Sequence, residues 1–138
     1  MPAKDIFHDT VRLALEKDDW KIIFENFHLK TGGSQMYIDL TAEKLITAQK
    51  KNRQIAVEIK SFVGNSDMTE FHLALGQFLN YRLALKKKFP TWILYLAIPL
   101  DTYETLFRRS FIQDAVREYQ LKLLVFDSQK QEIVEWID

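Results

Sequence analysis

The 138-residue sequence contains no cysteine, which excludes a disulfide scaffold and a zinc site built from thiolates. It also lacks a long hydrophobic segment, since the longest apolar run, residues 92–100, is too short to cross a membrane as a helix. Residues 1–9 have neither the apolar stretch nor the cleavage site of a signal peptide. These absences are typical of a protein in a reducing cytoplasm, where we expect the chain to be located.

Net charge is absent too, because nineteen basic residues balance nineteen acidic ones. Proteins that bind nucleic acid by charge alone are usually basic, so this balance disfavours an autonomous, non-specific DNA-binding protein. It leaves room for a local basic groove or for a partner chain. No glycine-rich phosphate loop is present, which removes the common nucleotide-binding motifs from consideration. Prolines and glycines are few and 47% of the residues are hydrophobic, so the composition predicts a packed fold.

No linker or repeat interrupts the chain, and residues 1–138 are expected to form one domain. Hydrophobic periodicity predicts helices at 3–18, 67–88 and 99–119, and strands at 20–27, 35–49, 54–63, 91–98, 121–126 and 132–137. Asp67 with Glu70 and Asp101 with Glu104 are the expected helix-capping pairs. The strand at 91–98 is the most apolar and is expected at the sheet centre. The order α-β-β-β-α-β-α-β-β indicates an α/β fold with a mixed β-sheet flanked by helices.

A charged pair, Glu58 and Lys60, stands in the otherwise apolar strand at 54–63. Residues two apart in a strand share a face, so both side chains point away from the face expected in the core, which comprises Val57, Ile59 and Val63. On the preceding strand Asp39 points away from Ile38 and Leu40 and can meet Glu58. Two converging carboxylates can bind Mg²⁺ or Mn²⁺, and a neighbouring ammonium can support attack of a metal-bound water on a phosphodiester.

The strand register leaves an alternative open. A turn centred on Lys51–Asn52, within the basic run at residues 50–53, would pair Glu58 with Leu45 and Lys60 with Glu43. A bulge would then be needed to bring Asp39 to Glu58. Glu43 could instead neutralise Lys60 in a structural ion pair, and an isolated Glu-x-Lys in a strand is commonly a solvated face.

The pattern of Asp39, then Glu58-Ile59-Lys60, resembles the PD-(D/E)XK nuclease superfamily, although Tyr37-Ile38 replaces the proline of its name motif. The sequence GQFLNYR adds Gln77 and Tyr81 on one face of the following helix, similar to an accessory motif of such nucleases. The resemblance implies a restriction-endonuclease-like fold with an α-β-β-β-α-β core. It implies metal ligation by Asp39, Glu58 and the Ile59 carbonyl, with Lys60 as the catalytic lysine. The roles implied for Gln77 and Tyr81 are to hold phosphate or water.

A closer resemblance covers nearly the whole chain. The segments PAKDIFHDTVRLAL, DLTAEKL, IAVEIKSFVG, ALGQFLNYR, LYLAIP and LKLLVFD are similar to the XisH family of cyanobacterial fdxN element excision controlling factors. This implies an accessory role in excising a DNA element during heterocyst development, with DNA, a site-specific recombinase and an XisI-type companion protein as partners. Glu25-Asn26 departs from the His-Asp pair that the family leads us to expect. A non-catalytic DNA- or protein-binding adaptor for the recombinase is the alternative, so enzyme status stays open.

Several further residues have expected roles. His8 shares a helix face with Asp5 and is expected either to form a hydrogen bond at the helix surface or boundary, or to act near the metal site. The basic run at 50–53 is a candidate contact for DNA phosphates, whereas Lys86–Lys88 are expected to stabilise a helix C-terminus. The apolar strand at 132–137 offers an edge for pairing, so we expect a homodimer.

Overall fold

The computed structural model describes residues 4–45 and 52–138. The helices are α1 (His8–Lys17), α2 (Asp67–Lys88), α3 (Leu100–Glu104) and α4 (Ser110–Glu118), with a short 3₁₀ helix, η1, at Leu106–Arg108. The strands are β1 (Lys21–Thr31), β2 (Ser34–Leu45), β3 (Asn52–Ile59), β4 (Ile93–Pro99), β5 (Leu123–Asp127) and β6 (Glu132–Ile137). None of the described helices is long and apolar enough to span a membrane.

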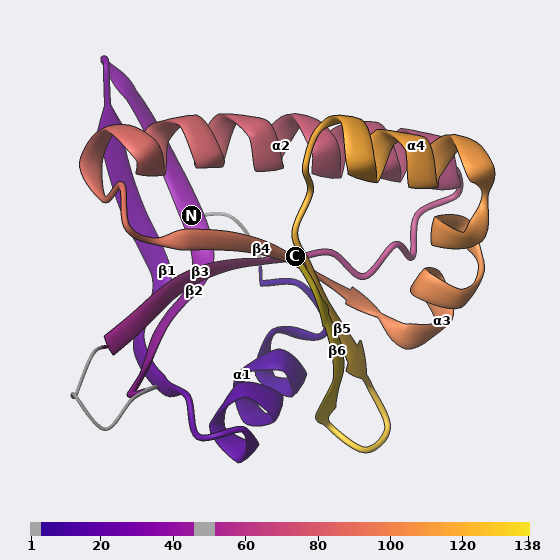
Figure 1. The fold of residues 1–138 in the computed structure, drawn as a ribbon, viewed down its shortest axis with the longest axis horizontal. Coiled ribbons are helices and arrows are strands. Elements are labelled where there is room, and N and C mark those ends of the chain that lie inside the picture. Colours follow the sequence, from indigo (N-terminus) through magenta and orange to yellow (C-terminus); the bar gives the residue numbers. More distant parts are fainter. Residues whose placement is uncertain (1–3, 46–51) are drawn as a thin grey trace.

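The six strands form one mixed sheet in the order β1-β2-β3-β4-β5-β6. Strands β3, β4 and β5 run parallel, and the pairs β1–β2, β2–β3 and β5–β6 are antiparallel. The predicted α/β class, the mixed sheet flanked by helices and the central position of β4 are thus confirmed. Helices α2 and α4 cover one face of the sheet and α1 lies on the other (Figure 1).

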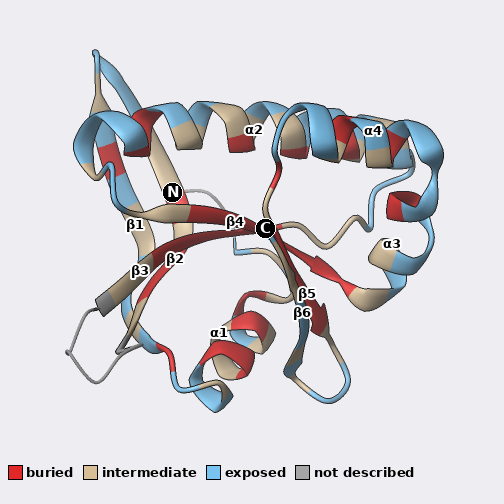
Figure 2. Ribbon diagram, viewed as in Figure 1, coloured by how far each residue is buried: buried red, intermediate tan, exposed pale blue. Residues whose placement is uncertain are grey.

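Both faces of the central strands are buried, because helices lie on each side of the sheet (Figure 2). Ala56 belongs to the apolar cluster beneath α2 and α4, whereas its neighbours Ile55 and Val57 belong to the cluster that includes Val11 and Leu15 of α1. This double burial explains why β3 reads as a nearly continuous apolar run. Glu58, on the α2 side, interrupts the run and is nevertheless buried.

Helix boundaries differ from the predictions in three places. α1 begins at His8 and not at residue 3, after a turn in which the His8 amide donates to the Asp5 carbonyl. α2 is capped by Ser66, whose hydroxyl accepts from the Thr69 amide, so Asp67 is not its N-cap. Two adjacent residues can both cap a helix well, and sequence alone does not separate them.

The third difference lies in the helix predicted at 99–119, which is broken into α3, η1 and α4, and the expected Asp101–Glu104 cap is not formed. The break occurs at Thr105, whose hydroxyl donates to the Asp101 carbonyl one turn earlier. It directs Leu106 and Phe107 into the core, where Phe107 contacts aromatic rings at 5.8–5.9 Å. Burial of these two side chains therefore accounts for the interruption.

Strand β3 ends at Ile59, and Val63 is 68% exposed, so the prediction that Val63 lies in the core is wrong. A two-residue turn joins β1 to β2: Thr31 pairs with Ser34, and Gly32 and Gly33 have the positive φ angles that such a hairpin requires. Half of the predicted turn at residues 50–53 lies outside the described residues, and Asn52 and Arg53 already belong to β3.

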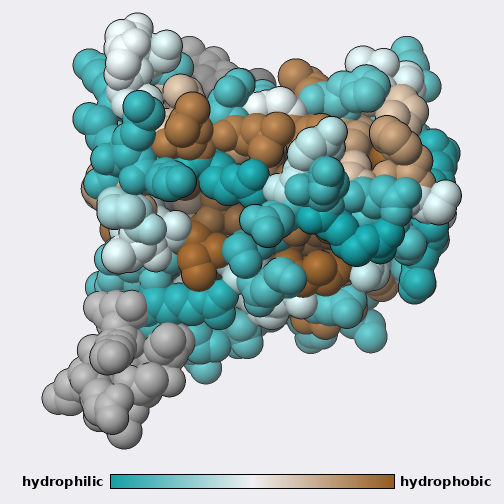
Figure 3. Space-filling view, turned by 45° about the horizontal axis from the view of Figure 1, so that its top comes forward, coloured by the Kyte–Doolittle hydropathy of each residue, from teal (hydrophilic) through white to brown (hydrophobic). Residues whose placement is uncertain are grey.

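The outer face of α2 and α4 is not uniformly polar. Leu73 and Leu83 on α2 and Phe111 on α4 are each more than half exposed. Figure 3 shows hydrophobic side chains among hydrophilic ones on the face that these helices form. Exposed apolar groups gathered on one face commonly mark a contact surface for another protein.

Candidate metal and phosphate site

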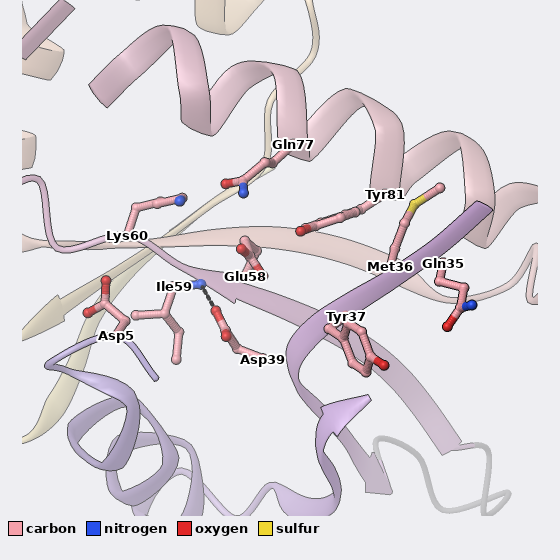
Figure 4. Close-up of a pocket in the computed structure, with 10 residues that line it drawn as sticks. All are labelled: Asp5, Gln35, Met36, Tyr37, Asp39, Glu58, Ile59, Lys60, Gln77 and Tyr81. Carbon is pink, nitrogen blue, oxygen red and sulfur yellow. Dashed lines mark hydrogen bonds between the residues drawn. The ribbon is translucent and has the colours of Figure 1, made fainter. Parts of the chain in front are cut away.

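The predicted site residues gather around one cavity of about 390 Å³ between the sheet and α2 (Figure 4). Strand β2 contributes Asp39, β3 and its extension contribute Glu58, Ile59 and Lys60, and α2 contributes Gln77 and Tyr81. Of the predicted set, only His8 does not line the cavity. The remaining lining residues are Asp5, Gln35, Met36 and Tyr37.

The register of β2 and β3 places the two carboxylates side by side. Leu40 pairs with Val57 and Leu45 with Asn52, so the ladder leads directly to Asp39 beside Glu58. The predicted pairing of Glu58 with Leu45 is therefore wrong, and no bulge is needed. Glu43 pairs with Gln54, six residues before Lys60, which removes the alternative of a structural Glu43–Lys60 pair.

Asp39 lies where the β1–β2 hairpin changes direction. Leu40 packs in the α1-side cluster, but Ile38, two residues earlier, packs in the α2-side cluster. Ile38 and Leu40 were predicted to share a face, and the twist of the hairpin separates them. The end of the β1–β2 hairpin that carries the turn lies beside α2 (Figure 1). The Asp39 side chain is fixed by the Ile59 amide, which donates to its Oδ2 at 2.8 Å.

Burial makes both carboxyl groups resist ionisation. Glu58 is 6% exposed, and desolvation, followed by the negative charge of Asp39, raises its pKa to about 9. Desolvation also raises the pKa of Asp39, although the hydrogen bond from Ile59 favours its charged form. Lys60 acts in the opposite sense and lowers the pKa of Glu58. At neutral pH and without a cation, the pair therefore retains a proton.

Oxygen atoms in this cavity suit a hard divalent cation. Glu58 Oε1 and Gln77 Oε1 are buried and have no hydrogen-bond partner within the described part of the chain. Unpaired buried acceptors are costly, and a cation beside them would relieve that cost and favour the ionised carboxylates. Mg²⁺ is commonly bound by one or two carboxylates together with waters. The residues present thus fit such an ion, with Asp39 and Glu58 as the carboxylate ligands.

Lys60 is held by its backbone at the end of β3. Its amide donates to the Ala97 carbonyl at 3.0 Å, which continues the pairing with β4. The next amide, that of Ser61, donates to Asp5 Oδ2 at 3.0 Å, while Asp5 Oδ1 accepts from the Phe7 amide at 2.9 Å. Asp5 therefore ties the start of α1 to the backbone beside Lys60. No local sequence pattern signals this role, because an aspartate before a helix is ordinarily a cap.

Gln77 and Tyr81 lie one turn apart on α2 and both face the cavity, as their spacing predicts (Figure 4). Desolvation, with the nearby charges of Glu58 and Asp39, raises the pKa of Tyr81 to about 12. The Tyr81 hydroxyl therefore keeps its proton across the physiological range. It is available as a hydrogen-bond donor to an anion or a water in the cavity.

His8 does not line the cavity, and only part of its prediction holds. It is 2% exposed, so a position on the helix surface is excluded. Its Nε2 lies 2.8 Å from Glu25 Oε1, and Arg12 Nε is 3.7 Å from the same oxygen. His8 is close enough to Asp39 to lower its pKa. Glu25, one of the two residues that depart from the expected His-Asp pair, thus serves as the partner of His8.

His8, Asp9 and Glu25 also bring three potential ligand atoms within 4.8 Å of one another. Cations of the protein already pair with the two carboxylates: Arg12 lies near both, and Lys4 lies 3.9 Å from Asp9. Electrostatic competition from these cations makes the His8–Asp9–Glu25 group less suited to a metal ion.

The chain matches the model of the XisH protein family over residues 1–134. It is 41% identical to an XisH family protein from Nostoc punctiforme PCC 73102, with a TM-score of 0.89 over 97% of this chain and 100% of that chain. It is 43% identical to an fdxN element excision controlling factor protein from Anabaena variabilis, with a TM-score of 0.89 over 98% of this chain and 100% of that chain. Among curated proteins, none matches.

Proposed function

Because this chain belongs to the XisH family and is related to fdxN element excision control, we propose that it acts as an accessory factor in DNA rearrangement. The fold we propose is restriction-endonuclease-like, with a Mg²⁺- or Mn²⁺-dependent phosphodiesterase site in the cavity. The single observation that carries the proposal is the adjacency of Asp39 and Glu58, both with raised pKa, with Lys60 beside them.

Asp39, Glu58 and the Ile59 carbonyl would hold the cation, which when bound would polarise a phosphate oxygen and acidify a bound water. Lys60 would then offset negative charge that develops on the phosphate during hydrolysis. Tyr81 would donate its hydroxyl proton in a hydrogen bond to a phosphate oxygen or to the attacking water. Gln77 would orient the same groups through its amide.

Cleavage of DNA tests this activity. Nicked, branched and blunt duplexes are incubated with the protein and Mg²⁺ or Mn²⁺, and products are separated on denaturing gels. We expect cleavage that is lost in Glu58→Gln and Lys60→Met and is retained in Glu135→Gln, a matched change at an exposed strand position. Cleavage that survives both cavity substitutions would refute the assignment.

A non-catalytic adaptor is the second candidate function, and one observation favours it: the exposed apolar side chains Leu73, Leu83 and Phe111 on the α2–α4 face. In this case the partners would be DNA, a site-specific recombinase or an XisI-type companion protein. A homodimer paired through β6, which is an edge strand of the sheet, is the further assembly we propose. Sedimentation at micromolar concentration tests the dimer.

Excision in cells separates the two candidates. A strain that carries Glu58→Gln or Lys60→Met is expected to lose excision of the element if the site is catalytic. The adaptor role predicts that excision continues with these changes and fails with Leu73→Asp/Leu83→Asp. The same readout addresses a purely structural interaction protein, which would tolerate both cavity substitutions.

A further inference from the structure

Charges are distributed unevenly along this neutral chain. Residues 26–38 and 71–100 contain no aspartate or glutamate. The first segment carries Lys30, and the second carries Arg82 and Lys86–Lys88. The first comprises the hairpin between β1 and β2 with its flanking strands, and the second most of α2 together with β4. One part of the molecule is therefore basic although the whole has no net charge.

The fold brings the two acid-free segments together. Phe27 of β1 packs on Phe89 and Trp92, which follow α2, with ring centroids 5.9 and 5.5 Å apart. A surface pocket is lined by Lys30, the hairpin tip and Lys88. Figure 1 shows the hairpin standing beside that end of α2. We call the basic surface formed by Lys30, Gly32, Gly33 and Lys86–Lys88 the hairpin surface.

The lysines of the hairpin surface are available to a ligand. Lys30 and Lys86–Lys88 are exposed, and within the described residues none of them forms an ion pair or a hydrogen bond through its side chain. Arg82, by contrast, has a structural role, since it donates to the carbonyls of Tyr119 and Gln120 at 2.9 Å. Stabilisation of the α2 C-terminus accounts for Lys86–Lys88 but not for Lys30 on the hairpin.

The hairpin surface is continuous with the candidate metal site, because Gln35 lines both the surface pocket and the cavity. From Ser34 to Asp39, strand β2 advances five residues, about 17 Å at roughly 3.4 Å per residue. That length matches about five nucleotide steps along one strand of duplex DNA. The space beside Gly32 and Gly33 is open, since a Cβ added at either residue would meet nothing within 4 Å. A ligand can therefore approach the backbone of the hairpin tip closely.

We propose that the hairpin surface binds the phosphate backbone of duplex DNA, so that one strand runs from Lys30 and Lys88 toward Lys60. The proposal rests on the proposed function in taking DNA as the ligand of the site. It adds the direction from which the duplex enters and the residues that hold it. Contacts of this kind are independent of base sequence, so they position the duplex and leave any sequence preference to another element or partner.

Binding of a labelled 20-base-pair duplex, followed by fluorescence anisotropy in EDTA between 50 and 200 mM salt, tests the proposal without metal or cleavage. Lys30→Ala/Lys88→Ala is compared with Lys21→Ala/Lys130→Ala, which removes the same charge from exposed positions outside the acid-free segments. We expect the first variant to bind about tenfold more weakly at 50 mM salt. Its slope of log K against log salt should be shallower by about 2, because two phosphate contacts are lost.

Equal affinities and salt slopes for the two double variants would overturn the proposal, as would a wild-type protein that binds no duplex at 50 mM salt. Failure of the metal site is distinguishable from these outcomes. Mg²⁺ binding by calorimetry should be unchanged in Lys30→Ala/Lys88→Ala, which also reports that the variant is folded. A wild-type protein that binds the duplex in EDTA but binds no Mg²⁺ would contradict the metal site alone and leave the hairpin surface in place.

Discussion

Replacement of Glu58 by glutamine should make the metal-free protein more stable at neutral pH. The pKa of Glu58 is raised from 4.5 to about 9 by burial and by Asp39, so the folded state holds a proton that the unfolded chain releases above pH 4.5. The stability that the protonated Glu58 side chain contributes is fully present below pH 4.5 and is lost as the pH rises through about 9. The glutamine side chain of the variant does not titrate and suffers no such loss.

The magnitude follows from the linkage between protons and folding. Each pH unit between 4.5 and about 9 removes up to about 1.4 kcal/mol from the wild-type free energy of unfolding. Between pH 4.5 and pH 7 the wild type should therefore lose roughly 3 kcal/mol that the variant retains. Part of this difference is shared with Asp39, whose raised pKa acts in the same direction.

The assay is urea denaturation in EDTA at several pH values, with Glu135→Gln as a matched control at an exposed strand position. We expect the advantage of Glu58→Gln over wild type to grow with pH, and Glu135→Gln to follow the wild type throughout. A stability difference between Glu58→Gln and wild type that does not change from pH 5 to pH 8 would refute the reasoning. It would mean that Glu58 ionises in the folded protein as it does in water.

Three further predictions concern single side chains. Lys60→Met should keep Mg²⁺ binding, as measured by calorimetry, but should lower the rate of DNA cleavage by about a hundredfold or more, which is the loss typical of removing one group that stabilises the transition state. An unchanged cleavage rate would exclude a catalytic role for Lys60. Phe107→Ala should lower the free energy of unfolding by about 3–5 kcal/mol in urea denaturation, whereas Phe111→Ala, at a 65% exposed position, should lower it by less than about 1 kcal/mol. Equal losses in the two variants would contradict the burial of Phe107. Asp5→Ala leaves the backbone amides of Phe7 and Ser61 without their acceptor, and it should lower the free energy of unfolding by about 1–3 kcal/mol in the same assay. An unchanged urea midpoint would show that water replaces the carboxylate.

The strands and their order along the chain were well predicted from the sequence, because each strand is marked by an apolar run bounded by polar residues or glycine. Double burial makes β3 and β4 especially apolar, and this pattern also indicated that β4 is central. Glu58 stood out for the same reason: a carboxylate in a run buried on both faces requires an explanation. The gathering of Gln77 and Tyr81 around it followed from helical spacing.

Other features depended on tertiary structure. In the structure Leu45 pairs with Asn52, and this pairing sets the register of β2 and β3. The basic residues near position 51 suggested instead a turn centred there, which would pair Leu45 with Glu58. A one-residue change in that turn moves every facing pair, so the alternative with Glu43 stayed open. The burial of His8 against Glu25 joins residues 17 apart on two elements, and no local pattern reports such a contact.

The central claim is that Asp39 and Glu58 form a cation site, and calorimetric titration of the purified protein with Mg²⁺ and Mn²⁺ tests it most directly. Wild type should bind saturably with release of a proton at pH 7, because burial leaves Glu58 protonated until a cation favours the carboxylate. Glu58→Gln should lose this binding, and Glu135→Gln should retain it. Absence of saturable binding in the wild type, or equal binding in Glu58→Gln, would contradict the account.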